Sequence, residues 1–192
     1  MPSRRVPIAL NAGTYCLTLT VERWYYLFDR FNRWQILADS LRYCQENKEL
    51  QLNGYVFMLN HIHLIVSSPD AAGFLRDFKR FTSRQLRESL QNHEPRVLEL
   101  FVDEQGTYRF WQDTNAPKKI ENSAFYLQKL NYLHENPVRK GYVVKPEYWS
   151  PANPEFAVVG YVFVVFEEKS MRDRGCNFAP NVFTMLELHC WV

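Results

Sequence analysis

The sequence contains little cysteine, and its few cysteines are far apart. They are Cys16, Cys44, Cys176 and Cys190. No two form a C-x-x-C pair, and their spacings match no zinc-binding template, which excludes the common zinc fingers and ribbons. The N-terminal apolar stretch is also too short for a secretory signal. Scattered thiols without such a signal predict a reducing environment, and hence a cytoplasmic protein.

Long apolar runs and a large excess of one charge are missing as well. The longest apolar run, FAVVGYVFVVF at 156–166, is far shorter than the roughly 20 residues of a membrane helix, so we expect no membrane segment. The formal net charge is only +2, so total charge does not indicate a nucleic-acid-binding protein. Any basic surface must therefore come from local clusters of lysine and arginine.

What the sequence does contain is a series of segments with clear strand or helix patterns. Strands are predicted over 14–21, 50–59 and 61–68, and helices over 33–47, 72–93 and 123–136. In the last helix, Ser123 is a candidate N-cap and Pro137 the expected stop. This order predicts an α+β fold: a ferredoxin-like antiparallel sheet with helices packed on one face.

Two histidines interrupt an otherwise apolar stretch, VFMLNHIHLIV at 56–66. On a strand, His61 and His63 share one face, because successive side chains point in opposite directions. Two imidazoles at the end of a buried strand are costly unless their nitrogens are satisfied. A divalent cation would satisfy them. The alternative is that both histidines are hydrogen-bonded to neighbouring residues or to water.

A later helix offers two further polar candidates. Tyr132 and Asn136 are four residues apart and so lie on one helical face. The apolar stripe runs instead through Tyr126, Leu130 and Leu133, so Tyr132 is not needed for the core. The alternative for Tyr132 is an ordinary half-buried aromatic residue.

These motifs together resemble a known family. The segment NHIH, followed by an apolar strand and later by YLHENPVRKGYV, is similar to the single-tyrosine HUH transposases. Within them, the REP-associated tyrosine transposases and the small insertion-sequence transposases are the nearest in pattern. FWQD at 110–113 also resembles a Trp-Gln element, here Trp111 and Gln112, that precedes the catalytic helix. The resemblance covers about residues 8–148, which we take as the transposase-like domain, with 149–192 as a divergent extension.

The resemblance implies a role for each matching residue. Tyr132 would be the nucleophile, and His61, His63 and Asn136 would hold Mg²⁺ or Mn²⁺. The activity implied is single-strand DNA cleavage and rejoining through a 5′-phosphotyrosine bond, at sites flanked by hairpins. The DNA partner would be single-stranded or hairpin DNA, and a homodimer is one possible assembly. The implied fold is the same ferredoxin-like sheet predicted from the segment order.

A basic stripe is a candidate for binding the DNA backbone. On the helix at 72–93, basic residues recur with helical spacing: Arg76, Lys79, Arg80, Arg84 and Arg87. The alternative is a solvated helix face. Further candidates are Arg139 and Lys140, which follow the proposed active-site helix, and Trp111, which can stack on unpaired bases, together with Gln112.

Two other functions remain open at the level of sequence. The same chemistry serves nicking and replication-initiation enzymes, although these more often carry two tyrosines or a helicase domain. A non-enzymatic nucleic-acid-binding module on a ferredoxin-like sheet would explain the basic helix, but would leave His61, His63 and Tyr132 without a role.

Overall fold

The computed structural model describes residues 10–149, and its elements lie close to those predicted. The strands are β1 (Gly13–Thr20), β2 (Gln51–Phe57), β3 (His61–Ser68) and β4 (Lys118–Lys119). The α-helices are α1 (Arg33–Asn47), α2 (Ala71–His93), α3 (Pro95–Leu98) and α4 (Ser123–Arg139), and 3₁₀ turns form η1 (Glu22–Trp24), η2 (Glu99–Phe101) and η3 (Pro146–Tyr148). The divergent extension predicted over 149–192 lies outside the described residues, apart from Trp149.

The strands form one antiparallel sheet in the order β2-β3-β1-β4. With α1 after β1 and α2 after β3, this is the ferredoxin-like arrangement, which confirms the predicted α+β fold. The edge strand β4 pairs only Lys118 and Lys119 with β1. It lies in a stretch that has too little periodicity to be predicted from sequence.

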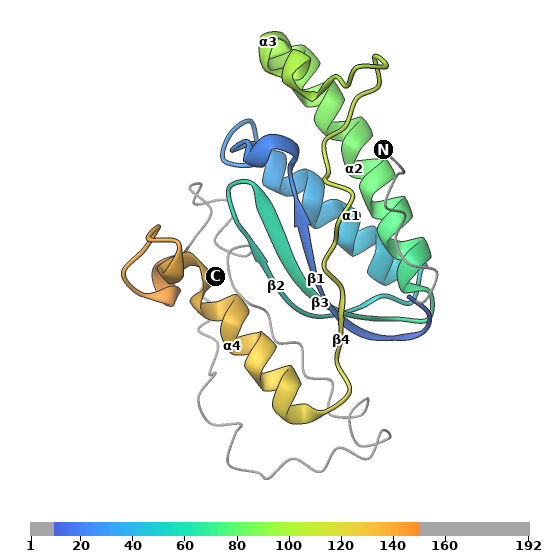
Figure 1. Cartoon of the computed structure of the whole chain (residues 1–192), viewed down its shortest axis with the longest axis vertical. Helices are drawn as coiled ribbons and strands as arrows, with labels where there is room; N and C mark the ends of the chain where they lie inside the picture. Colours follow the sequence, from blue (N-terminus) through green and yellow to red (C-terminus); the bar gives the residue numbers. More distant parts are fainter. Residues whose placement is uncertain (1–9, 150–192) are drawn as a thin grey trace.

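One face of the sheet packs against α1 and α2 in a large apolar core (Figure 1). Ile62, Leu64 and Val66 of β3 point into it, as do Leu17 and Leu19 of β1. All five are almost completely buried. The strands therefore follow the two-residue repeat of a pleated sheet, with their most apolar positions facing these two helices.

The opposite face packs against α4, in a smaller cluster that includes Val56, Ile65, Leu130 and Leu133 (Figure 1). The predicted placement of helices on one face thus holds for α1 and α2, whereas α4 covers the other face. Gly54 allows the close approach, because a Cβ there would lie 3.2 Å from Leu130 Cδ1. With the side chain of Leu130 so near, α4 rests almost directly on the sheet.

Helix α4 begins at Ser123, as predicted, but its N-cap and its C-terminal end differ from the prediction. Its N-cap is Asn122, whose Oδ1 accepts a hydrogen bond from Phe125 N at 2.9 Å, and not Ser123. The helix also continues through Pro137 to Arg139. Proline is tolerated there because its fixed φ is helical and only one intrahelical bond is lost near the end of the helix. The helix therefore extends three residues beyond the predicted end at 136.

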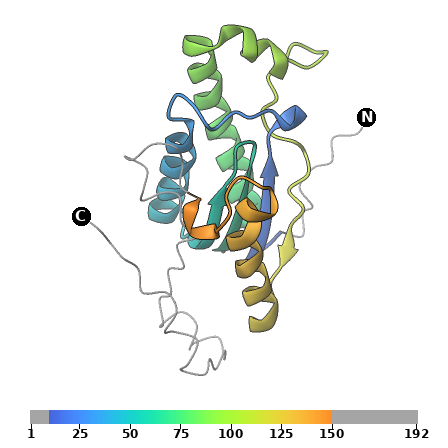
Figure 2. The same ribbon diagram turned by 90° about the vertical axis from the view of Figure 1, so that its left-hand side faces the viewer.

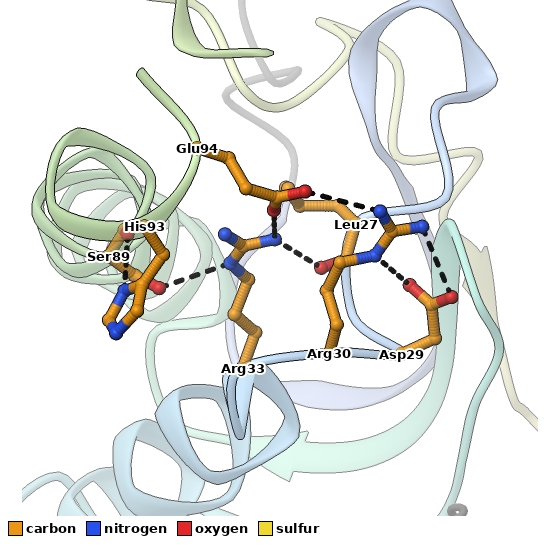
Figure 3. A network of polar contacts seen from close by, with 7 residues as sticks. All are labelled: Leu27, Asp29, Arg30, Arg33, Ser89, His93 and Glu94. Atoms are coloured by element: carbon orange, nitrogen blue, oxygen red, sulfur yellow. Dashed lines mark hydrogen bonds and ion pairs between the residues drawn. The ribbon is translucent and has the colours of Figure 1, made fainter. Parts of the chain in front are cut away.

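A buried ion pair connects the start of α1 to the end of α2 (Figure 3). Arg33 is 0% exposed, and its Nη1 lies 2.7 Å from Glu94 Oε2. This contact lacks the alignment of a hydrogen bond, but Arg33 also donates to Ser89 Oγ at 3.1 Å and to the Leu27 carbonyl at 3.3 Å. Arg30 approaches the other Glu94 oxygen at 3.2 Å. The network fixes two helices on the same side of the sheet.

Beyond the sheet, α2 extends past the strands and leads to α3 (Figure 2). The chain then returns along the molecule to β4 and α4. Within residues 10–149, no helix has both the length and the apolar character needed to span a bilayer.

Candidate active site

The two histidines lie at the start of β3, on the face that α4 covers. They share this face with Ile65, which packs in the α4 cluster, while Ile62 and Leu64 point to the other side. The imidazoles of His61 and His63 are adjacent, with ring centroids 4.8 Å apart. Both side chains are buried. The prediction that the histidines share one face is therefore confirmed.

The orientation of His61 is set by Asn60, a buried residue in the turn between β2 and β3. Asn60 Nδ2 donates to the carbonyl oxygen of Trp24 at 2.8 Å. Because a carbonyl can only accept, the amide oxygen of Asn60 must face His61 Nδ1, which is 2.7 Å away. His61 Nδ1 therefore carries the proton, and Nε2 keeps a free lone pair.

His63 contacts polar groups through both ring nitrogens. Its Nδ1 is 2.8 Å from Thr18 Oγ1, and its Nε2 is 2.8 Å from Asn136 Nδ2. If Nδ1 carries the proton and donates to Thr18, Nε2 is left as an acceptor for Asn136. Asn136 is itself buried. The structure thus brings together residues of β1, β3 and α4 that are distant in sequence.

Both imidazoles are electrically neutral at neutral pH. Burial, with a smaller contribution from the nearby Lys140, lowers the pKa of His61 to about 4. Burial also lowers the pKa of His63 to about 3, with smaller contributions from His61, Lys140 and Lys129. A neutral imidazole whose Nε2 carries no proton is a form that can bind a metal ion.

Tyr132 lies beside this pair. Its ring meets the ring of His63 edge to face, with centroids 5.4 Å apart, and its side chain is 38% exposed. Two cations flank the phenol: Arg139 Cζ lies 5.6 Å and Lys129 Nζ 5.8 Å from the ring centroid. The exposed phenol, flanked by cations, is accessible to an anionic ligand. Its neighbours on α4, Tyr126, Leu130 and Leu133, form the apolar stripe that was predicted.

The donors present fit a divalent cation with an open coordination sphere. Within the part of the chain that the structure describes, no cluster of three or more His, Cys, Asp and Glu residues is found. A site here would therefore use the Nε2 atoms of His61 and His63 and the amide oxygen of Asn136. Such a nitrogen and oxygen set suits several divalent ions, and leaves positions for a phosphate oxygen. For Asn136 this requires the amide to turn its oxygen toward His63.

The basic stripe of α2 does not meet these residues. Arg76, Arg80, Arg84 and Arg87 are exposed, but α2 lies on the sheet face opposite α4. Asp77 pairs with Arg76 and Arg80, and Arg87 packs over the ring of Tyr108. A DNA strand that contacted both the stripe and Tyr132 would have to pass around an edge of the sheet.

Three other predicted DNA-binding residues are engaged in the fold. The Lys79 Nζ donates to the carbonyl oxygen of Gln112 at 2.6 Å. Burial lowers the pKa of Lys79 to about 8. Trp111 is buried, and its Nε1 donates to Thr82 Oγ1 at 2.9 Å, so its ring offers no free face for stacking. The Gln112 amide reaches the Val21 carbonyl at 3.4 Å. The exposed Arg139 and Lys140, in contrast, lie at the site.

Sequence reasoning did not identify Thr18 or Asn60 as parts of this site. The signal for Thr18 was present: Thr18 and Thr20 alternate with Leu17 and Leu19, which predicts a polar face on β1. Nothing in the local sequence showed that this face would meet His63. The role of Asn60 has no local signal, because it depends on the distant carbonyl of Trp24.

Comparison with known proteins supports the fold. No protein-family model matches the chain. No curated protein matches it either. Among solved structures, the chain is similar to a REP-associated tyrosine transposase bound to a REP hairpin, with a TM-score of 0.55 and 19% sequence identity. The match covers 72% of this chain and 74% of the other. The chain therefore has the fold of that transposase, as predicted.

Proposed function

We propose that this chain is a metal-dependent transposase that cuts and rejoins single-stranded DNA through a covalent bond to Tyr132. The observation that carries the proposal is the contact of the Tyr132 phenol with His63, whose ring centroids are 5.4 Å apart. His61 lies directly beside His63. An exposed tyrosine next to two buried, neutral imidazoles is the arrangement that such chemistry needs.

In the proposed step, the Tyr132 oxygen attacks the phosphorus of a DNA phosphodiester. The bond from phosphorus to the 3′ oxygen breaks, the phenol loses its proton, and the departing 3′ oxygen gains one. The 5′ phosphate remains bonded to Tyr132. Because one phosphodiester replaces another, the reverse attack by a 3′-hydroxyl can join a new strand without ATP.

A bound Mg²⁺ or Mn²⁺ would polarise the phosphate and offset the negative charge that develops on it. His61 and His63 would hold the ion through Nε2, with Asn136 as the third ligand. Asn60 and Thr18 would fix the two rings through their Nδ1 atoms, at 2.7 and 2.8 Å. The chain thus supplies both the ligands and the groups that orient them.

The charges around the phenol favour a nucleic acid as the substrate. Arg139 and Lys129 flank the ring of Tyr132, and Lys140 is close enough to affect both histidines. Phosphates on either side of the attacked bond would meet these cations. The REP hairpin bound by the similar structure supports hairpin-flanked DNA as the first substrate to test.

The experiment is to incubate the full chain with labelled, hairpin-flanked single-stranded DNA and Mn²⁺, and to run a denaturing gel. We expect a DNA adduct that survives denaturation with the wild type and none with Tyr132→Phe. Tyr142→Phe is the matched control, since Tyr142 follows the same helix, and should form normal amounts of adduct. Equal adduct from wild type and Tyr132→Phe would refute the assignment of the nucleophile.

A second candidate function, a non-enzymatic nucleic-acid-binding module, is favoured by one observation. Asn136 Nδ2 lies 2.8 Å from His63 Nε2, so this nitrogen has a partner without any metal ion. A binding module would bind the DNA, form no adduct, and gain no thermal stability from Mn²⁺. The transposase should be stabilised by Mn²⁺, and His63→Ala should abolish that gain.

A further inference from the structure

Trp24 presents a large exposed ring at the border of the candidate active site. Trp24 is the last residue of η1, and its ring meets the ring of His61 edge to face, with centroids 6.1 Å apart. The residue is 56% exposed. A tryptophan normally buries most of its surface, so this one has an aromatic face that the described part of the chain does not cover.

The backbone holds this ring in place in an unfavourable conformation. Arg23 and Trp24 both have positive φ values, 57° and 56°, which residues other than glycine rarely adopt. Trp24 N donates to the Val21 carbonyl at 3.1 Å, and the Trp24 carbonyl accepts from the buried Asn60 at 2.8 Å. Strained backbone that is held by its surroundings is concentrated at functional sites.

The Asn60 side chain connects this strained turn directly to the proposed metal ligand. One end of its amide binds the Trp24 carbonyl, and the other binds His61 Nδ1 at 2.7 Å. The backbone of Trp24 and the imidazole of His61 are therefore both held by the buried Asn60 side chain. A ligand that contacts Trp24 lies beside His61, which contacts His63 and, through it, Tyr132 with its flanking cations Lys129 and Arg139.

We propose that Trp24 is a stacking platform for one unpaired nucleobase next to the phosphate that Tyr132 attacks. The inference rests on the proposed function, because that function places unpaired DNA at this site. An exposed indole accepts any base on its face, while the neighbouring cations take the adjoining phosphates. The aromatic contact predicted for Trp111, which is buried, is thus assigned to Trp24.

The test measures DNA binding without chemistry. A full-length Tyr132→Phe variant is mixed, in EDTA, with a fluorescent hairpin that carries a short unpaired thymidine flank, and Kd is measured by anisotropy. Adding Trp24→Gly should weaken binding by about 5- to 100-fold, the usual effect of losing one stacked base. Glycine accepts the positive φ, so the turn keeps its conformation. Trp24→Phe should restore most of the affinity.

The matched control is Tyr43→Ala, which removes an aromatic residue of similar exposure (58%) on α1, across the sheet from α4. Its Kd should not change. Ultraviolet crosslinking of a flank containing iododeoxyuridine should also label the peptide with Trp24. The proposal is overturned if Trp24→Gly binds as tightly as its parent, if Tyr43→Ala weakens binding equally, or if the hairpin does not bind.

The outcome can be separated from that of the proposed function. Trp24-dependent binding without a covalent adduct in the wild type would support base stacking on Trp24 and refute the transposase. An adduct that depends on Tyr132 but is formed equally well by Trp24→Gly, with unchanged Kd, would support the transposase and refute the stacking role of Trp24.

Discussion

The two faces of the sheet differ sharply, although the same strands build both. On the side of α1 and α2, β3 contributes Ile62, Leu64 and Val66 to a continuous apolar core. On the side of α4, the same strand contributes apolar Ile65 and then His63 and His61. From Ile62 to Val66 the first face is apolar, whereas the α4 face carries a single apolar residue, Ile65, between Ser67 and the two histidines.

This difference separates the residues that stabilise the fold from those of the candidate active site. The apolar face gains free energy from burying hydrophobic area. The polar part of the other face gains little, because each buried nitrogen must first be satisfied by a partner such as Asn60, Thr18 or Asn136. We therefore expect substitutions on the two faces to have different effects: on unfolding at one face and on DNA cleavage at the other.

The largest effect on the α1 and α2 side is expected from Glu94→Ala. Removing this carboxylate leaves Arg33 buried without its counter-charge, which should lower the free energy of unfolding by about 3–5 kcal/mol. Urea denaturation measures the loss. Asp39→Ala, which breaks the exposed pair with Arg42, is the control and should cost at most about 1 kcal/mol. Similar losses for the two variants would show that burial of the pair is unimportant.

On the α4 side, Asn60→Ala should reduce the rate of adduct formation by about 10- to 100-fold, because His61 loses the group that fixes its ring. Asn60→Asp keeps the acceptor for His61 but loses the donor to Trp24, so its rate should fall less. Gel assays over a time course compare the three proteins. A normal rate for Asn60→Ala would show that His61 does not need this support.

The position of α4 itself can be tested at Gly54. Gly54→Val places methyl groups against Leu130 and should cost about 1–3 kcal/mol through overpacking. It should also displace Tyr132 from His63, so adduct formation should fall even where the protein is fully folded. Gly54→Ala adds only a Cβ and should have a smaller effect on both measurements. If Gly54→Val lowers stability alone, α4 does not need this close approach for catalysis.

The last effect concerns pH, at Lys79 on α2. Its pKa is about 8 in the folded chain, below the ordinary value of 10.5, because burial disfavours the charge. Between these two values the unfolded chain binds more protons, so this residue makes the protein more stable as pH rises. From pH 7.5 to 9.5 the wild type should gain roughly 2 kcal/mol relative to Lys79→Met. Denaturation curves at both pH values measure it, and a constant difference would contradict the prediction.

The repeat patterns of the sequence were enough to predict several of these features. The alternation along 61–66 places His61 and His63 on one face, and the four-residue spacing of Tyr132 and Asn136 puts both on one side of a helix. The segment order likewise predicts the antiparallel sheet that the structure shows. These are local properties, since they depend only on the geometry of a strand or a helix.

Contacts between distant segments could not be obtained in this way. The burial of Trp111 depends on its packing against α2, and the orientation of His61 depends on a carbonyl some forty residues earlier in the chain, at Trp24. The side of the sheet on which α4 lies places Tyr132 near His63 and away from the arginine stripe of α2.

By itself, the sequence determined which residues share a strand face or a helix face, because the backbone fixes those periods within each element. Only the tertiary structure decided which of these faces meet, and thereby which polar groups are satisfied and which aromatic ring stays exposed. The reason is that packing and hydrogen bonding join groups that are far apart along the chain, and no local pattern records their partners.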